Sequence, residues 1–542
     1  MNKIFRYSLI LSLGALFVAC SSEDDIVSEW VTDNEVDPPT SGTLDLTNYV
    51  AVGNSLTAGF ADGALFPEGQ ANSFPSILAA QLAQAGGGSF VYPDISSGNG
   101  FGGASGDFIL GRRFIDLPTA LAALAGDPDV EVADAIQVTA GSALTASSVT
   151  GSGVNNFGVP SARLIDLSVA GYGAANPFFG AFQSSPTASI LGDAVSAEGS
   201  FFTLWAGSND VLGYAIDGGA AGETFNPLNP KTITDAATFT AALKGTLDAL
   251  SAGGAEGVLL NVQPVTIIPF FQTVTTLSGG LTILPAGSID AGTAGFLNSA
   301  AAYGAYNGGL DALVGVAPGF TAEEAAFRKI TFTADVANVP VITDESLTDL
   351  SGFGLASMRQ AQVDPTTGAT DLFGLTALSV IGSLADPDDP TSVYGVGVPV
   401  PDENTLTLTE QGAVIAAYVQ FNAIIAAEAS ARDNITLVDV GPMFADIYGL
   451  SPAQAAGLGL STDAQAAADS ELGILVGGID LVPLSLTQEA IFNSVWSADG
   501  VHPNPRGAAI LVNEIIGALN DKYGSSIPTV NPLDFPGINA PF

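Results

Sequence analysis

The chain of 542 residues contains one histidine, His502, and one cysteine, Cys20. A single cysteine excludes any disulfide within the chain. One histidine and one cysteine also cannot supply the ligand cluster of a zinc site. Any chemistry that needs a side chain titrating near neutral pH must therefore involve His502. We expect neither a metal nor an organic cofactor in the site.

Basic residues are also scarce, with 13 Lys and Arg against 55 Asp and Glu, a formal net charge of −42. Repulsion at this charge excludes nucleic acid as a partner and makes electrostatic attraction to acidic membranes equally improbable. We interpret the acidity as a solvated, salt-tolerant surface. A carboxylate calcium site stays open as an alternative, for instance around Asp386-Pro387-Asp388-Asp389.

The N-terminus has the pattern of a secretory signal. Lys3 and Arg6 precede an apolar run at 7–18, which is too short to span a bilayer, and Cys20 follows it. The stretch resembles a bacterial lipoprotein lipobox, with Phe17 where Leu is usual. The acidic residues after Cys20 resemble the surface-export tag of Bacteroidetes lipoproteins. An ordinary cleaved signal with a chance cysteine is the alternative.

This pattern predicts three segments with different roles. Residues 1–20 would be a lipoprotein signal peptide with lipid attachment at Cys20, and residues 21–43 a flexible acidic tether. The protein would then be an outer-membrane lipoprotein of the cell envelope, anchored by lipid. Residues 44–542 would form one domain with insertions at about 85–149 and 273–401, because the motifs described below lie at its two ends. The sequence leaves the side of the membrane and the oligomeric state open.

Apolar spacing predicts alternating strands and helices along this domain. Asp235 and Asn504 are expected to begin helices, and Gly524 to end one. Such alternation favours an α/β fold with a parallel sheet. The strands are expected at 46–52, 201–206, 257–262 and 435–439, and the helices over the apolar faces Phe239/Leu243/Leu247/Leu250, Val414/Tyr418/Phe421/Ile425 and Leu511/Ile515/Leu519.

The first expected strand runs into Gly53-Asn54-Ser55-Leu56, where a helix can begin. The hydroxyl of Ser55 would then lie at the carboxyl edge of the sheet, where open α/β sheets bind their ligands. Taken alone, a serine in such a turn is more often a helix cap than a nucleophile.

Two further segments lie at or next to expected strand ends. One is Asn155-Asn156-Phe157-Gly158-Val159-Pro160-Ser161-Ala162-Arg163, and the other is Gly207-Ser208-Asn209-Asp210. Each segment alone fits an ordinary turn or strand-loop-helix junction.

The fourth segment, Asp499-Gly500-Val501-His502, lies near the C-terminal end of the sequence. An aspartate three residues before a histidine can turn back and accept a hydrogen bond from one imidazole nitrogen. The other nitrogen then stays free to take a proton from a nucleophile. Pro503 and Asn504-Pro505 would hold His502 on a stiff loop before a helix. A surface loop with an incidental histidine is the alternative.

In this order the four segments resemble the blocks of the SGNH, or GDSL, hydrolase family. The resemblance implies a three-layer sandwich with a parallel, flavodoxin-like central sheet that carries large insertions. It also implies a catalytic triad of Ser55, Asp499 and His502. The oxyanion hole would be formed by the backbone N–H groups of Ser55 and Ser161 and the side-chain amide of Asn209.

The sequence departs from the family at two positions. Asn54 replaces the usual aspartate, which keeps an oxygen acceptor for the turn and removes a charge. Ser161 replaces the family glycine, which keeps the backbone N–H but adds a side chain, and Gly158 is the alternative donor.

The resemblance implies a secreted, lipid-anchored serine ester hydrolase of the esterase or lipase type. Its ester could belong to a small molecule, a lipid or an acylated glycan, and the insertions would form walls of the binding pocket. The alternatives are a catalytically silent surface binding protein on the same scaffold and a structural surface-layer component, which the Gly- and Ala-rich composition favours.

Overall fold

The computed structural model of the protein describes residues 37–95, 98, 100–102, 110–115, 136–278, 280–366, 368–447 and 494–537. The predicted signal peptide, Cys20 and residues 21–36 of the predicted tether lie outside the described residues.

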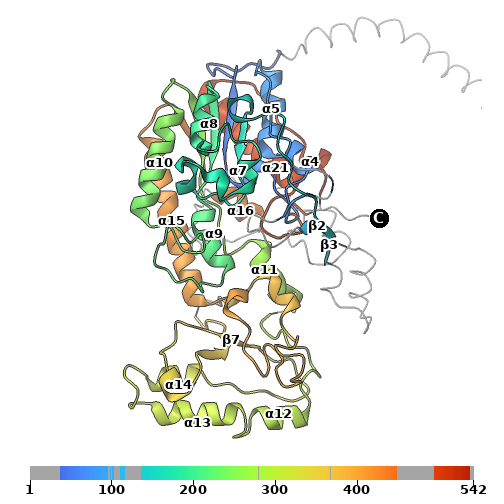
Figure 1. The fold of residues 1–542 in the computed structure, drawn as a ribbon, viewed down its shortest axis with the longest axis vertical. Coiled ribbons are helices and arrows are strands. Elements are labelled where there is room, and N and C mark those ends of the chain that lie inside the picture. Colours follow the sequence, from blue (N-terminus) through green and yellow to red (C-terminus); the bar gives the residue numbers. More distant parts are fainter. Residues whose placement is uncertain are drawn as a thin grey trace, which may run out of the picture.

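A five-stranded parallel sheet forms the centre of the described chain (Figure 1). Its strands lie in the spatial order β11-β6-β5-β1-β4, and every neighbouring pair is parallel. Counted along the chain, this order is 2-1-3-4-5, the order of flavodoxin-like doubly wound sheets. The predicted α/β class with a parallel sheet is therefore confirmed. The strands are β1 (Tyr49–Gly53), β4 (Asn156–Gly158), β5 (Phe201–Trp205), β6 (Glu256–Leu260) and β11 (Ile435–Val438).

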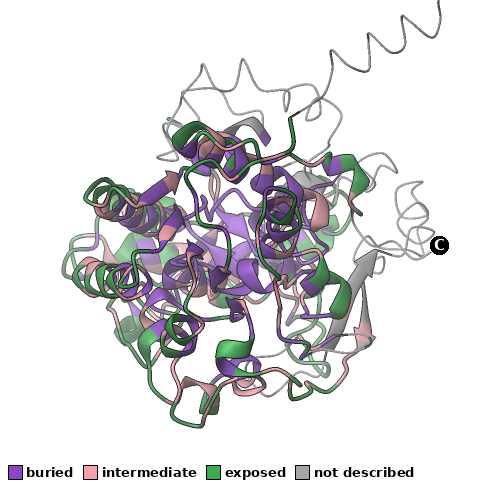
Figure 2. Ribbon diagram, turned by 90° about the horizontal axis from the view of Figure 1, so that it is seen from above, coloured by how far each residue is buried: buried purple, intermediate pink, exposed green. Residues whose placement is uncertain are grey.

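Helices cover both faces of the sheet, as right-handed crossovers between parallel strands require. Figure 1 shows α5 and α21 on one side and α8, α10 and α15 on the other. Figure 2 shows buried residues gathered at the middle of the molecule and exposed ones at its periphery. The covering helices are α5 (Phe74–Gln84), α8 (Ile190–Ser196), α10 (Ala236–Leu250), α15 (Leu408–Ser430) and α21 (Pro505–Tyr523).

The predicted helix ends are confirmed at all three positions. The Asp235 side chain accepts hydrogen bonds from two backbone N–H groups at the start of α10. Asn504 caps α21, Pro505 is its first residue, and Gly524 ends it with φ of 62° in the left-handed region. A residue without Cβ adopts that conformation at little cost.

Helix α15 is long and apolar enough to cross a membrane by length and composition alone. Its predicted apolar face is nevertheless buried inside the protein, and Phe421 stacks on Phe239 of α10 with ring centroids 4.0 Å apart. These contacts identify α15 as a core helix of the sheet domain.

Shorter elements connect the layers. They are α3 (Ser55–Ala58), α4 (Pro67–Ala71), α7 (Pro177–Gly180), α9 (Asn209–Ile216), α11 (Pro269–Leu277), α16 (Gly441–Ile447), the antiparallel hairpin β2 (Leu110–Ile115) and β3 (Ile136–Ala140), and 3-10 turns that include η2 (Gly151–Gly153), η3 (Leu164–Ser168), η4 (Tyr172–Ala174) and η8 (Pro532–Asp534).

Residues 281–400 form a second lobe below the sheet domain in Figure 1. It has a separate hydrophobic core that includes Leu310, Ile330, Val341 and Leu350. Its predicted elements at 339–344 and 358–360 pair as an antiparallel ladder. The lobe contains α12 (Ala291–Leu297), α13 (Tyr303–Leu313), α14 (Ala322–Phe327), β7 (Val341–Thr343), β8 (Met358–Gln360), β9 (Leu372–Phe373), η5 (Ser351–Phe353) and η6 (Leu375–Ser379), and the chain returns to the sheet domain through η7 (Asp402–Asn404) and β10 (Thr405–Leu406).

Candidate active site

Ser55 lies at the junction between β1 and α3. Asn54 precedes α3, and its side-chain Oδ1 accepts a hydrogen bond from the Leu56 N–H at 3.0 Å. The predicted acceptor role of Asn54 is therefore confirmed. Ser55 is the first residue of α3, so its N–H is one of the helix-end donors that have no partner within the helix. Its side chain is buried at the carboxyl edge of the sheet.

His502 lies on a loop that is tied to the start of α21. The Asn504 side chain donates to the carbonyls of Ser494 and Trp496 at 2.7 and 3.1 Å, and it accepts from the Gly507 N–H. The Ser497 N–H also donates to the His502 carbonyl at 2.9 Å. These contacts hold the loop that carries His502 at the start of α21.

The three residues predicted as a triad form one hydrogen-bonded chain. His502 Nε2 is 2.8 Å from Ser55 Oγ, although the two residues are 447 positions apart in the sequence. His502 Nδ1 is 2.9 Å from Asp499 Oδ2. A tautomer with the proton on Nδ1 would leave Nε2 free to accept the serine proton.

Asp499 is buried and accepts several hydrogen bonds. Its Oδ1 receives the N–H groups of Val501 and His502, and its Oδ2 receives the Gly63 N–H at 2.8 Å. Burial by itself raises the pKa of Asp499. The His502 charge and the hydrogen bonds from His502 and Val501 outweigh burial and hold this pKa well below its usual range. The carboxylate therefore stays ionised near neutral pH.

Asp62 holds the segment that precedes His502 through contacts with Ser497 and Ala498. The sequence did not reveal this role. Asp62 is buried with a left-handed φ of 54°, and its Oδ1 accepts from the Ala498 N–H at 3.0 Å. Its backbone N–H donates to Ser497 Oγ, and Arg112 of β2 pairs with its other oxygen at 3.1 Å. The sequence signal was only an Asp-Gly turn after Ser55, which is common in loops.

Asn209 lies at the topological switch point of the sheet. It begins α9 directly after β5, and β5 is the neighbour of β1. One hydrogen of its side-chain amide is donated to the Ala162 carbonyl at 2.9 Å. Because an amide nitrogen has two hydrogens, the second can serve an oxyanion. The same bond fixes the loop that follows β4 on the other side of β1.

Ser161 lies on that loop in the left-handed region, with φ of 66°. Glycine adopts this conformation more easily than serine, which accounts for the family preference. The Ser161 side chain is exposed, so it fits without displacing a neighbour. No residue in the described part of the chain accepts a hydrogen bond from its N–H. The alternative donor, the Gly158 N–H, is already bound to Asn156 Oδ1 at 2.8 Å.

Asp210 connects helix α9 to the 3-10 turn η3. It is fully buried and accepts from the Leu164 N–H at 2.7 Å and the Thr234 hydroxyl at 2.8 Å. Burial raises the pKa of Asp210 to about 7, although both hydrogen bonds and Arg163 oppose the increase. Its contact with Leu164 joins the start of α9 to η3, so Asp210 helps to position Asn209.

Aromatic side chains form an apolar wall beside the imidazole. The Phe60 ring lies 5.0 Å from that of His502, centroid to centroid, and Phe178 packs edge-on against both Phe60 and Phe101. Apolar walls with a few convergent polar groups are typical of small-molecule sites.

Comparisons with known proteins identify no relative, because no family model, no curated protein and no solved structure matches this chain.

Proposed function

We propose that this protein is a serine ester hydrolase of the SGNH type. The observation that supports it most directly is the continuous hydrogen-bonded chain from Ser55 through His502 to Asp499. The strand order 2-1-3-4-5 agrees with the flavodoxin-like sheet of that family, and the serine and Asn209 lie at its switch point. The large insertions of the family's long members would correspond to residues 85–149 and 273–401.

In the proposed mechanism His502 takes the Ser55 proton as Oγ forms a bond to the ester carbonyl carbon. The N–H groups of Ser55 and Ser161 and the free amide hydrogen of Asn209 stabilise the oxyanion. When the carbon–oxygen bond to the alcohol breaks, His502 returns the proton to the departing oxygen. Water then attacks the acyl-enzyme by the same route and releases the acid and Ser55.

Support for activity over a silent scaffold comes from the two positions that depart from the family. Asn54 still accepts the turn hydrogen bond, and the Ser161 side chain lies outward with its N–H available. Neither departure removes a group that the mechanism needs.

The proposed substrate is a carboxylic ester with an apolar portion that can lie against the partly exposed ring of Phe60, which the buried Phe178 supports. Small esters, lipids and acylated glycans all fit this description. We further propose that the enzyme is held at the outer membrane by a lipid on Cys20, on the strength of the N-terminal sequence pattern.

A fluorophosphonate probe tests the activity without knowledge of the substrate. Attack by an activated serine forms a phosphorus–oxygen bond and releases fluoride, so we expect labelling that peptide mapping assigns to Ser55. Ser55→Ala and His502→Ala should not be labelled. Ser161→Ala is the matched control, because it removes a nearby serine but keeps the N–H, and it should be labelled normally. A folded wild-type protein that stays unlabelled would support the silent binding scaffold instead.

A further inference from the structure

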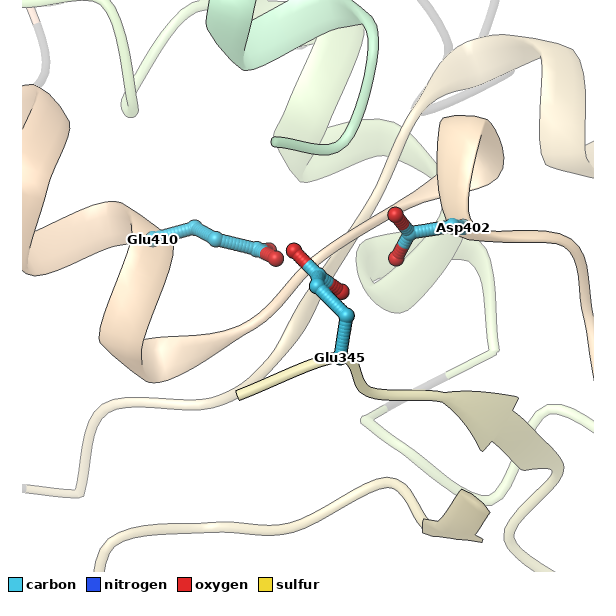
Figure 3. A group of neighbouring side chains, drawn as sticks. All are labelled: Glu345, Asp402 and Glu410. Atoms are coloured by element: carbon cyan, nitrogen blue, oxygen red, sulfur yellow. The ribbon is translucent and has the colours of Figure 1, made fainter. Parts of the chain in front are cut away.

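Three carboxylates converge where the second lobe meets the sheet domain (Figure 3). Glu345 follows β7 of the lobe, Asp402 begins η7, and Glu410 lies in the first turn of α15. One oxygen from each lies within 4.8 Å of one from each of the others. The three residues therefore bring segments of both parts of the protein to one point.

The two less exposed members of this group have atoms without partners. Glu410 is only 3% exposed, and its Oε2 accepts from the Thr407 N–H at 2.6 Å. Its Oε1 and Asp402 Oδ1 are buried and have no hydrogen-bond partner among the residues that the structure describes. Within the described residues, no Lys or Arg forms an ion pair with any of the three. Buried carboxylates without a compensating charge are strongly unfavourable.

Binding of a cation or of a proton can remove the free-energy cost of burying these carboxylates. Without a cation, burial first and the Glu345 carboxylate second raise the pKa of Glu410 far above its usual range, and they raise that of Asp402 likewise. In Figure 3 Glu345 lies between the other two, so each neighbour faces a like charge. A divalent cation at this point would allow all three groups to ionise together.

The donor set determines which cation fits. Carboxylate oxygens suit hard cations, whereas zinc sites need nitrogen or sulfur ligands. Two oxygens that bind the same Ca²⁺ at about 2.3–2.6 Å lie at most about 5 Å apart, and the separations within 4.8 Å meet this limit. Mg²⁺ usually keeps several waters and takes only one or two protein carboxylates, whereas Ca²⁺ accepts many oxygen ligands in a flexible geometry. Three protein carboxylates at one point therefore favour Ca²⁺.

We propose that Glu345, Asp402 and Glu410 bind a Ca²⁺ ion that clamps the second lobe to the sheet domain. The segment after α9 packs against this point. A Cβ on Gly218 would lie 1.9 Å from the Asp402 carbonyl oxygen, and one on Gly219 would lie 2.8 Å from Glu410 Oε1. Since α9 begins with Asn209, the ion would fix the far end of the helix that carries a proposed oxyanion donor.

Calorimetric titration of the EDTA-treated full-length protein with CaCl₂ tests the site. The titration should contain about 0.15 M KCl, because salt screens diffuse attraction to an acidic surface. We expect one site, and we expect Glu345→Gln to weaken it about tenfold or more, since affinity depends on the number of charged ligands. Glu345 is exposed, so this change should not disturb folding. The matched control is Asp388→Asn in the exposed loop at 386–389, which should leave the affinity unchanged.

Thermal unfolding provides a second measurement. Ca²⁺ should raise the Tm of the wild-type protein, because it binds the folded state, and the increase should disappear in Glu410→Gln. Glutamine preserves the capping box with Thr407, and in EDTA the variant should be at least as stable as the wild type. Equal Ca²⁺ responses in wild type and Glu410→Gln, or no calcium affinity in the wild type, would overturn the proposal.

Discussion

Ser161 adopts a backbone conformation that L residues rarely adopt, with φ of 66°. Strain of this kind costs about 1 kcal/mol or more and is typical of functional sites. Among the described residues the Ser161 N–H has no hydrogen-bond acceptor, and it lies on the loop that Asn209 holds through the Ala162 carbonyl. In the proposed mechanism this strain positions a backbone donor beside the oxyanion.

Asn209→Ala should lower turnover by about 10²–10³-fold, equivalent to about 3 kcal/mol of lost transition-state stabilisation. The variant loses the amide hydrogen that the proposed oxyanion would accept. The measurement is kcat on a chromogenic ester, together with fluorophosphonate labelling. Turnover equal to wild type would remove Asn209 from the site.

Ser161→Gly is the control for this prediction. It keeps the backbone N–H and relieves the strained φ, so activity should be retained and the Tm should stay equal or rise. Glu198→Gly matches it away from the site, because Glu198 also has a positive φ, of 52°. Its effect on the Tm should be similar, and it should not affect activity.

At the residue scale, the sequence predicted which three side chains would meet in one hydrogen-bonded chain, but it did not predict the residues that hold them in place. Ser55, His502 and Asp499 were found because each lies in a short motif with its own chemistry. Asp62 was missed because its contacts with Ala498 and Ser497 join segments more than 400 positions apart. A local sequence pattern cannot indicate a contact between such distant segments.

At the scale of elements, Asn504 links the end of the histidine loop to helix α21. It caps the helix through the Gly507 N–H, and its amide also binds the carbonyls of Ser494 and Trp496. The same residue therefore stabilises a helix and shapes the loop that presents His502.

Asn504→Ala should cost about 2 kcal/mol or more of unfolding free energy, because it removes a cap and the amide donor to the buried Ser494 carbonyl. The Trp496 carbonyl keeps a second donor, the Ser494 hydroxyl at 3.0 Å. The substitution should also reduce kcat, since His502 would no longer be held in place. Urea unfolding and ester hydrolysis at saturating substrate measure the two effects.

Asp235→Ala provides a matched cap deletion on α10. The hydrogen bonds of the Asp235 side chain go to Ala237 and Thr238 of its own helix. The substitution should cost about 1 kcal/mol of stability with activity unchanged. If Asn504→Ala also left kcat unchanged, the proposed link between cap and imidazole would be wrong.

Strands and helices with clear apolar patterns were predicted to within a few residues, because the sheet is buried on both faces. The strand β4 was harder to place, since it has only three residues and follows the 3-10 turn η2. Its register beside β1, Gly53 opposite Gly158, depends on tertiary contacts.

At the scale of the whole molecule, the sequence predicted the fold class but not the arrangement of the second lobe. Inside the lobe, Arg359 is buried and forms ion pairs with Asp344 and Asp371. A buried ion pair of this kind has no periodic signature. The carboxylate group at its boundary likewise involves three residues from separate segments, so composition suggested calcium at 386–389 instead.

The net charge of −42 gives the last prediction. Cations such as Arg359 and Arg432 form local ion pairs, so most of the remaining acids repel one another over long distances. Salt shortens the Debye length from about 30 Å at 0.01 M to about 8 Å at 0.15 M. The Tm in EDTA should therefore rise by a few degrees with NaCl, mostly below about 0.2 M, where the screening changes most. A Tm that falls over this range would mean that the ion pairs contribute more to stability than the repulsion removes.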